Sequence, residues 1–195
     1  MTGIVRIPMF PLSILPLPGE LVPLHIFEMR YRQLLSDMES NDITFGIYFS
    51  HEINQQKIGA LMRLESVIKR YPAGESDIIV KCEDIFTLDL LLRKFKDKLY
   101  PGGDVSCWKV NMNRYPGPAL YDLFVEYLNL RNISQQPTAF NCFQIANELN
   151  MDVSDRYKFL SIDPNHYENF LQNRIRFQTH LLHQESRSKD VYHLN

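Results

Sequence analysis

The sequence predicts an α+β protein in which a strand-rich first part is followed by a helical second part. In the first part, short apolar runs alternate with turn residues, and residues 43–50 place apolar side chains on one face at every second position. After Pro118, apolar residues recur with the period of a helix. The character changes at the turn-forming stretch 115–118, and such segregation of strands and helices is typical of the α+β class.

Composition limits the classes of function. The 195 residues are 45% hydrophobic and 23% charged, which suits one domain, or two small ones, with a sizeable core. A net charge of −2 gives no basic face for nucleic acid. Three distant cysteines, Cys82, Cys107 and Cys142, form no C-x-x-C pair, so we expect a reducing cytoplasm and neither a disulfide scaffold nor a zinc ribbon.

The N-terminal run is not expected to be a targeting segment. A single basic residue, Arg6, precedes an apolar stretch that five prolines interrupt, and no small-residue cleavage site follows. No apolar run reaches the ~18–20 residues that span a bilayer, so no membrane contact is expected. Because Leu, Ile, Val and Phe separate the prolines, the run belongs in a core and does not resemble an SH3-type ligand.

We expect the strands to make a small barrel or sandwich, because several short strands follow one another at close spacing. Pro8 and Pro11 limit pairing of the first strand, and Pro23 suits an edge or a bulge. The expected strands cover residues 4–7, 21–26, 43–50, 58–71, 77–82, 86–92 and 105–112.

Five helical segments are expected. The first begins at Phe27, carries one apolar face and ends at Asn41–Asp42. The apolar positions of that face are Phe27, Tyr31, Leu34, Leu35 and Met38. A second helix begins near Pro118, and two shorter ones cover residues 140–149 and 154–160, the latter with Ser154 as its N-cap. Asp163–Pro164 opens the last helix, with a frayed polar tail from Glu185.

Several sequence motifs of enzymes are missing. No glycine precedes a lysine, which excludes the phosphate-binding P-loop, and no two glycines are spaced for the G-x-S-x-G nucleophile elbow. The dinucleotide-binding and H-E-x-x-H zinc motifs are absent as well.

Two groups of histidines could in principle do chemistry. His180 and His183 could share a metal with Glu185 or His166, but polar-face histidines near a helix end are the favoured interpretation. His25 lies just before Glu28, where a catalytic pair is conceivable and a structural histidine is favoured. We therefore expect no metal and no cofactor.

A basic stretch could bind nucleic acid or an acidic partner. Its cations are Arg93, Lys94, Lys96 and Lys98. With Asp97 among them, a solvated face is the favoured interpretation. Trp108 is expected to be a buried core aromatic. The adjacent carboxylates Glu83 and Asp84 point to opposite faces of a strand and cannot address one bond without a bulge.

Four stretches of the chain carry a family resemblance. The opening residues 7–35 contain Ile7–Pro11, Leu17–Gly19, Pro23–Glu28 and Arg30–Arg32. These resemble the L-P-L-F-P strand, the L-x-P-G turn, the P-L-x-I-F-E strand end and the R-Y-R helix that begin the substrate-binding N-terminal domain of Lon proteases. Residues 43–50, 58–88 and 145–175 resemble its next strand, its hairpin and its helical tail, although Glu83 or Asp84 replaces the last glycine of the hairpin pattern.

The resemblance implies a PUA-like β pseudo-barrel over residues 1–114, followed by a C-terminal helical bundle over 115–195. It also implies a non-catalytic module that holds unfolded or degron-bearing polypeptides for an ATP-dependent protease or chaperone. Because the sequence ends after this region, the ATPase and peptidase modules of Lon are expected to be missing. The expectation is a stand-alone adaptor in protein quality control, not an enzyme.

The peptide-binding residues and the competing functions remain open at this stage. The prolines lower the entropy of the unfolded chain and protect an irregular edge. Leu15, Leu17 and Pro18 in the turn could bind apolar peptide, with burial in the core as the favoured alternative. An RNA-binding PUA-like domain that uses Arg93 to Lys98 is the second hypothesis. A hydrolase that uses His25 or His183 is the third, and it lacks a visible nucleophile.

Overall fold

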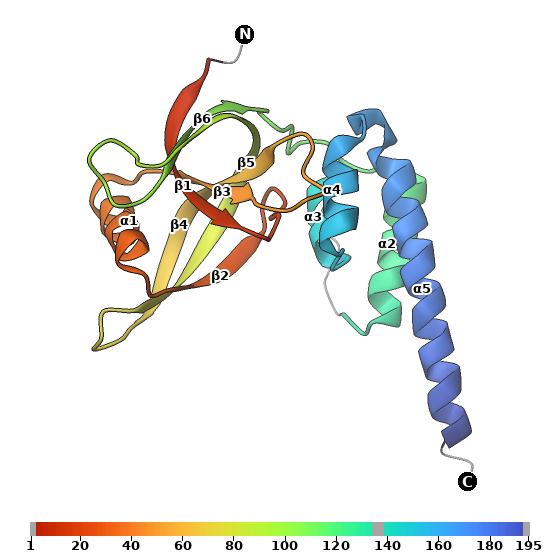
Figure 1. The fold of residues 1–195 in the computed structure, drawn as a ribbon. Helices are drawn as coiled ribbons and strands as arrows, with labels where there is room; N and C mark the ends of the chain where they lie inside the picture. Colours follow the sequence, from red (N-terminus) through yellow and green to blue (C-terminus); the bar gives the residue numbers. More distant parts are fainter. Residues whose placement is uncertain (1–2, 134–138, 193–195) are drawn as a thin grey trace. The chain divides into compact units, whose positions relative to one another are not determined.

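The computed structural model describes residues 3–133 and 139–192, with side chains described up to residue 184. The chain divides into two compact units, Met1–Asn111 and Met112–Asn195 (Figure 1). The first unit holds the strands and one helix, and the second holds only helices. The predicted α+β fold is therefore confirmed.

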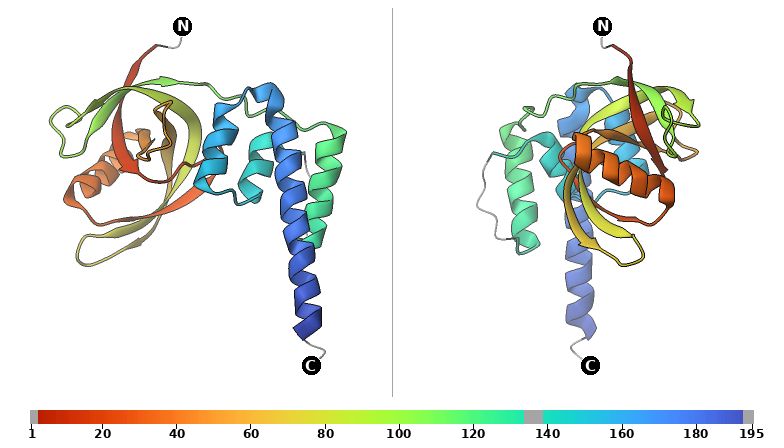
Figure 2. Two further views of the ribbon diagram at one scale, coloured as in Figure 1. Left: turned by 45° about the vertical axis from the view of Figure 1, so that its right-hand side comes forward. Right: turned by 90° about the vertical axis from the view of Figure 1, so that its left-hand side faces the viewer.

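Five strands of the first unit close into a barrel, which Figure 2 shows from two further sides. Their order around the barrel is β1, β3, β4, β5 and β6, with β6 pairing back to β1. The sixth strand, β2, pairs with the first half of β5. Among the strands that the structure describes, β1 and β3 form the one parallel pair. The bounds are β1 Val5–Leu12, β2 Leu21–Ile26, β3 Phe45–Phe49, β4 Ile58–Arg70, β5 Ser76–Leu92 and β6 Gly102–Cys107.

Strand β1 is longer than predicted and contains both Pro8 and Pro11. Its first half pairs with β6 and its second half with β3, so it is not an edge of the sheet. The expected strand over residues 4–7 is therefore too short, since pairing continues through both prolines to Leu12. Each half of β1 pairs with a neighbouring strand on one side only. A proline whose nitrogen lies on the unpaired side removes no backbone hydrogen bond from the sheet.

Strand β5 joins two segments that were predicted as separate strands. Its first half pairs with β2 and its second half with β6, while β4 runs beside most of its length. The register shifts so that Leu61 lies opposite Asp84 and Met62 opposite Cys82, which leaves Glu83 as the extra residue of a β-bulge. The bulge lies at the position where the Lon pattern would have glycine.

The barrel core is built around Phe86. A Cβ on Gly59 would lie 2.4 Å from the Phe86 ring, and one on Gly46 would lie 2.8 Å from it. The two glycines on neighbouring strands therefore make room for the ring. Around Phe86 pack the buried side chains of Ile7, Met9, Leu88 and Val105.

Helix α1, Met29–Asn41, packs its apolar face against the barrel unit. Tyr31, Leu34, Leu35 and Met38 are buried as predicted, and Asp42 ends the helix in the left-handed conformation. Phe27 departs from the prediction. It lies before the helix and is 56% exposed.

The second unit consists of α2 Pro118–Leu130, α3 Cys142–Glu148, α4 Val153–Ser161, the short 3₁₀ helix η1 Pro164–His166 and α5 Tyr167–Tyr192. Helix α2 buries Leu120, Phe124, Tyr127 and Leu128, as its stripe predicted. Asp163 caps η1 by accepting a hydrogen bond from the backbone of Asn165, also as expected.

Two details of the helical unit correct the sequence-based expectation. Asp152, not Ser154, caps α4, because its side chain accepts from the backbone N–H of Asp155. Helix α5 continues to Tyr192 instead of fraying from Glu185. In the part of the chain that the structure describes, no helix is long and apolar enough to cross a membrane.

Candidate functional site

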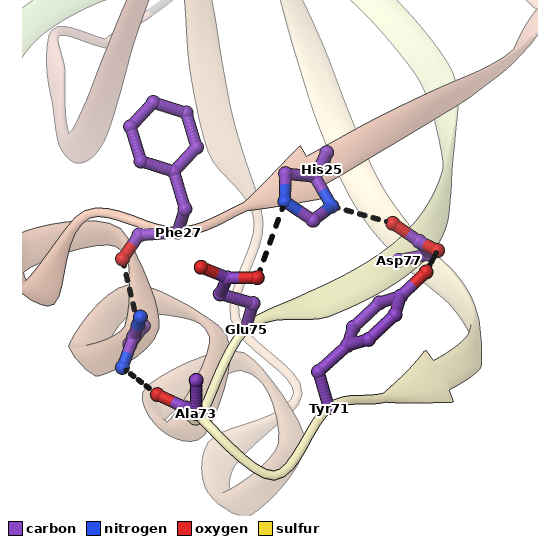
Figure 3. Close-up of polar contacts among 7 residues, drawn as sticks. His25, Phe27, Tyr71, Ala73, Glu75 and Asp77 are labelled. Atoms are coloured by element: carbon purple, nitrogen blue, oxygen red, sulfur yellow. Dashed lines mark hydrogen bonds and ion pairs between the residues drawn. The ribbon is translucent and has the colours of Figure 1, made fainter.

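His25 belongs to a polar cluster on the outer face of the barrel, where β2 meets the β4–β5 hairpin (Figure 3). Its Nδ1–H donates to Asp77 Oδ1 at 2.7 Å, and its Nε2 lies 3.8 Å from Glu75 Oε2. The Tyr71 hydroxyl donates to the other Asp77 oxygen at 2.6 Å. Both oxygens of Asp77 are therefore engaged, and the imidazole lies between two carboxylates.

The strand pairing explains why His25 and Asp77 approach so closely. Just before β2, the N–H of Cys82 donates to the carbonyl of Glu20 at 2.9 Å, and hydrogen-bonded pairs alternate from there along an antiparallel ladder. The His25–Asp77 pair then falls at a non-hydrogen-bonded position, where side chains lie closest. Pro23 falls at the same type of position, so its missing N–H costs no bond with β5.

The hydrogen bonds of the cluster stabilise the charged form of Asp77. The bond from Tyr71, and secondarily the one from His25, holds the pKa of Asp77 below its usual value. The same bond raises the pKa of Tyr71, because it favours the neutral phenol. The phenol is thus a hydrogen-bond donor at neutral pH and not a nucleophile.

Arg32 of α1 fixes the hairpin beside this cluster. Its Nε donates to the Phe27 carbonyl and its Nη1 to the Ala73 carbonyl, each at 2.7 Å (Figure 3). The neighbouring Gly74 has φ +87°, and a Cβ there would lie 2.6 Å from the guanidinium. The backbone conformation favours a glycine at this turn, and a Cβ there would make the end of the Arg32 side chain shift.

Next to the cluster lies an apolar cleft of about 430 Å³, here called the β2 cleft. Its wall is made by Pro23, Leu24, His25, Ile68, Asp77, Ile78 and Ile79. Ile68 is 64% exposed, and the exposed ring of Phe27 stacks against His25 with 6.0 Å between ring centroids. Exposed apolar side chains that gather around a concave surface are typical of binding sites.

His25 does not form the pair with Glu28 that the sequence suggested. Glu28 binds Arg30 of its own segment at 2.7 Å instead. The thiols of the first unit are poor nucleophiles as well, because burial raises the pKa of both Cys82 and Cys107. In the described residues, His25 is paired with Asp77 and not with Glu28.

The turn residues that the sequence offered for peptide binding are buried. Leu15 and Leu17 are 1% and 0% exposed, and Pro18 is buried beside them. The turn is closed by the Glu20 side chain, which accepts from the backbone N–H of Leu17 at 2.9 Å. These side chains offer no contact area to a peptide in this structure.

The basic stretch does not form one continuous face. Lys96 and Lys98 line a cavity of about 530 Å³, here called the charged cavity, whereas Arg93 and Lys94 are exposed outside it. Lys98 Nζ is paired with Asp37 Oδ1 at 2.8 Å. The charged cavity lies between the start of β1, the end of α1 and the loop before β6.

Asp37 is the polar centre of that cavity. It accepts from Lys98 and from the Tyr100 hydroxyl, at 2.8 and 2.7 Å. Burial alone would raise the pKa of Asp37, but the two hydrogen bonds together outweigh it and hold the pKa below its usual value. Burial and the bond to Asp37 raise the pKa of Tyr100.

The remaining candidates have structural partners. Glu83 binds Arg63, and Asp84 accepts from the backbone N–H groups of Lys109 and Val110. Trp108 is half-buried, and its Nε1 donates to Thr87.

Among the described side chains, the histidines of α5 belong to no group that could hold a metal. His180 contacts Gln184 through its Nε2, and the Glu185 side chain lies outside the described residues. Among the side chains that the structure describes, no group of three His, Cys, Asp or Glu residues is arranged to hold a metal.

Comparison with solved structures identifies the fold. A crystal structure of a Lon N-terminal domain protein from Xanthomonas campestris matches with a TM-score of 0.66 and 22% identity, over 85% of this chain and 95% of that one. The chain has the fold of a Lon N-terminal domain. The N-terminal domain of the Mycobacterium avium complex Lon protease matches this Lon-N-like fold as well, with a TM-score of 0.64 and 13% identity, over 88% and 98% of the two chains. No protein-family model and no curated protein matches the sequence.

Sequence reasoning found His25 of the β2 cleft but missed its partners. Asp77 and Tyr71 are far from His25 in the sequence and reach it only through the pairing of β2 with β5. The alternation of β2 was the available signal, because it turns His25 outward and Ile26 into the core.

Proposed function

We propose that this Lon-N-like chain is a non-catalytic module that binds unfolded polypeptide segments through the β2 cleft. The observation that carries the proposal is the apolar concave surface lined by Ile68, beside the exposed Phe27 ring that stacks on His25, on a barrel with the fold of Lon N-terminal domains. An unfolded segment exposes apolar side chains that a native protein buries, and their transfer into a cleft is favourable.

The polar cluster gives the cleft a defined rim. Asp77 and Tyr71 keep the His25 ring in place, and the hairpin is tied to α1 through Arg32. A rigid rim lowers the entropic cost of binding, because fewer side chains have to be ordered. In the cell, the module would present misfolded or degron-bearing clients to an ATP-dependent protease or chaperone in a reducing cytoplasm.

The test is binding to one protein in two states. A reduced, carboxymethylated protein that cannot refold should bind to the purified chain, and its native form should not. The expected dissociation constant for a short apolar segment is in the micromolar range, which corresponds to a binding free energy of about −8 kcal/mol. Equal binding of both states, or of neither, would contradict the proposal.

A further inference from the structure

The charged cavity, which is separate from the β2 cleft, is large enough to hold a small ligand. Its volume of about 530 Å³ is within the ~300–1,000 Å³ of typical small-ligand pockets. Its lining combines charged groups with apolar side chains, namely Val5, Ile7, Pro8, Ile43 and Phe95. Four cations but only two carboxylates line it, namely Arg6, Arg63, Lys96 and Lys98 against Asp37 and Asp42.

The acidic groups of the cavity are already engaged by protein donors. Asp37 accepts from Lys98 and Tyr100, and Asp42 accepts from Arg63 Nη1 at 2.8 Å. Both oxygens of Asp37 are therefore engaged, whereas Asp42 accepts through Oδ1 and its side chain is 83% exposed.

Arg6 and Arg63 are each held by carboxylates and keep N–H groups that make no hydrogen bond to them. Arg6 binds Asp104 with Nε and Nη2 at 2.6 and 2.9 Å, which leaves its Nη1. Arg63 binds Glu83 with Nε and Asp42 with Nη1, which leaves its Nη2. Because a guanidinium has five N–H donors in a rigid fork, fixing one side orients the other.

Lys96 supplies a cation with no acidic partner. Its ammonium lies 5.4 Å from the centroid of the Phe95 ring, and no ion pair involves it in the part of the chain that the structure describes. Its backbone is left-handed, with φ 51°. Lys96 can therefore pair with an anionic ligand without breaking an ion pair of the protein.

We propose that the charged cavity binds a carboxylate joined to a small apolar group, with the acid at Arg6, Arg63 and Lys96 and the apolar group against Ile7, Ile43 and Phe95. Two sources share this chemistry, the C-terminal residue of a polypeptide and a free small carboxylic acid. The site is separate from the β2 cleft and does not depend on the function proposed for it.

The same charges disfavour RNA as the occupant. Binding to a nucleic acid backbone depends on several cations that neutralise successive phosphates. Here Arg6, Arg63 and Lys98 already have carboxylate partners, and only Lys96 does not. The arrangement suits one monoanionic group in a cavity that is open to solvent.

The experiment measures binding of a fluorescent hexapeptide that ends in Ala-Leu with a free carboxylate. The controls are its C-terminal amide and competition by isovalerate, both with the full chain. The variant is Lys96→Gln, and the matched control is Lys57→Gln, a second exposed lysine with a left-handed backbone that does not line the cavity. Amide NMR spectra of the chain locate the bound peptide.

The proposal predicts that amidation weakens binding at least about tenfold and Lys96→Gln about fivefold, with Lys57→Gln and Ile68→Ser unchanged. The NMR shifts should fall on residues that line the cavity. Competition by isovalerate at equal affinity assigns the site to free acids, and much weaker competition assigns it to chain termini. Equal binding of acid and amide, equal losses in both lysine variants, or tighter binding of an RNA oligonucleotide at Lys96 would overturn the proposal.

Discussion

His25 and Asp77 face each other across the β2–β5 pair, with 2.7 Å between Nδ1 and Oδ1. The contact joins two strands that are distant in the sequence and forms the polar side of the β2 cleft. Asp77 also accepts a hydrogen bond from Tyr71, so a substitution at any of the three residues should alter the hydrogen bonding of the other two.

Removing the Tyr71 hydroxyl should shift the titration of Asp77. The pKa of Asp77 is lowered in the folded protein, so its carboxyl should titrate below the ordinary value of about 3.9. In Tyr71→Phe the largest cause of that shift is lost, and Asp77 should titrate at higher pH. Carboxyl NMR titration measures this. Tyr115→Phe, an exposed tyrosine in the other unit, should leave the curve where it is.

Asp37 should contribute stability that depends on pH. Because its pKa is lower in the folded state, the contribution is present above the unfolded value of about 3.9 and is lost as the pH falls through the folded value. Asp37→Asn should lower the free energy of unfolding by about 1–3 kcal/mol at neutral pH. In urea titrations the difference from the wild type should narrow below about pH 4. A constant difference, or the same narrowing in the exposed Asp97→Asn, would argue against this assignment.

Gly59→Ala should destabilise the barrel. The new Cβ would lie 2.4 Å from the Phe86 ring and 2.6 Å from the Ile47 carbonyl, and the backbone atom cannot move aside without loss of pairing. Such overpacking costs about 1–3 kcal/mol, measurable by thermal or urea unfolding. Gly3→Ala is the control, because nothing lies within 4 Å of a Cβ there. Equal stability of the two variants would mean that the core adapts.

Local patterns were sufficient for much of the fold. Strict alternation gave β3, and the apolar period gave the buried faces of α1 and α2. Both signals are local, since each element buries one side against a core. The prediction for Phe27 was wrong because an apolar residue just before a helix can fit the helical period whether it is buried or exposed.

Long-range pairing could not be predicted in the same way. Nothing local shows that the two halves of β1 pair with different strands, β6 and β3, or that β5 continues through a bulge at Glu83. The site depends on the same pairing. His25 could be identified, but Asp77 becomes its partner only through the β2–β5 register.

The most direct test of the central claim compares Ile68→Ser with Ile4→Ser in binding to a protein that is kept unfolded. The two isoleucines are 64% and 66% exposed, and only Ile68 lines the β2 cleft. If unfolded segments bind there, Ile68→Ser should weaken binding about tenfold, because an apolar contact is lost, while Ile4→Ser stays at the wild-type affinity. Equal affinities in the two variants would contradict the β2 cleft as the polypeptide-binding site.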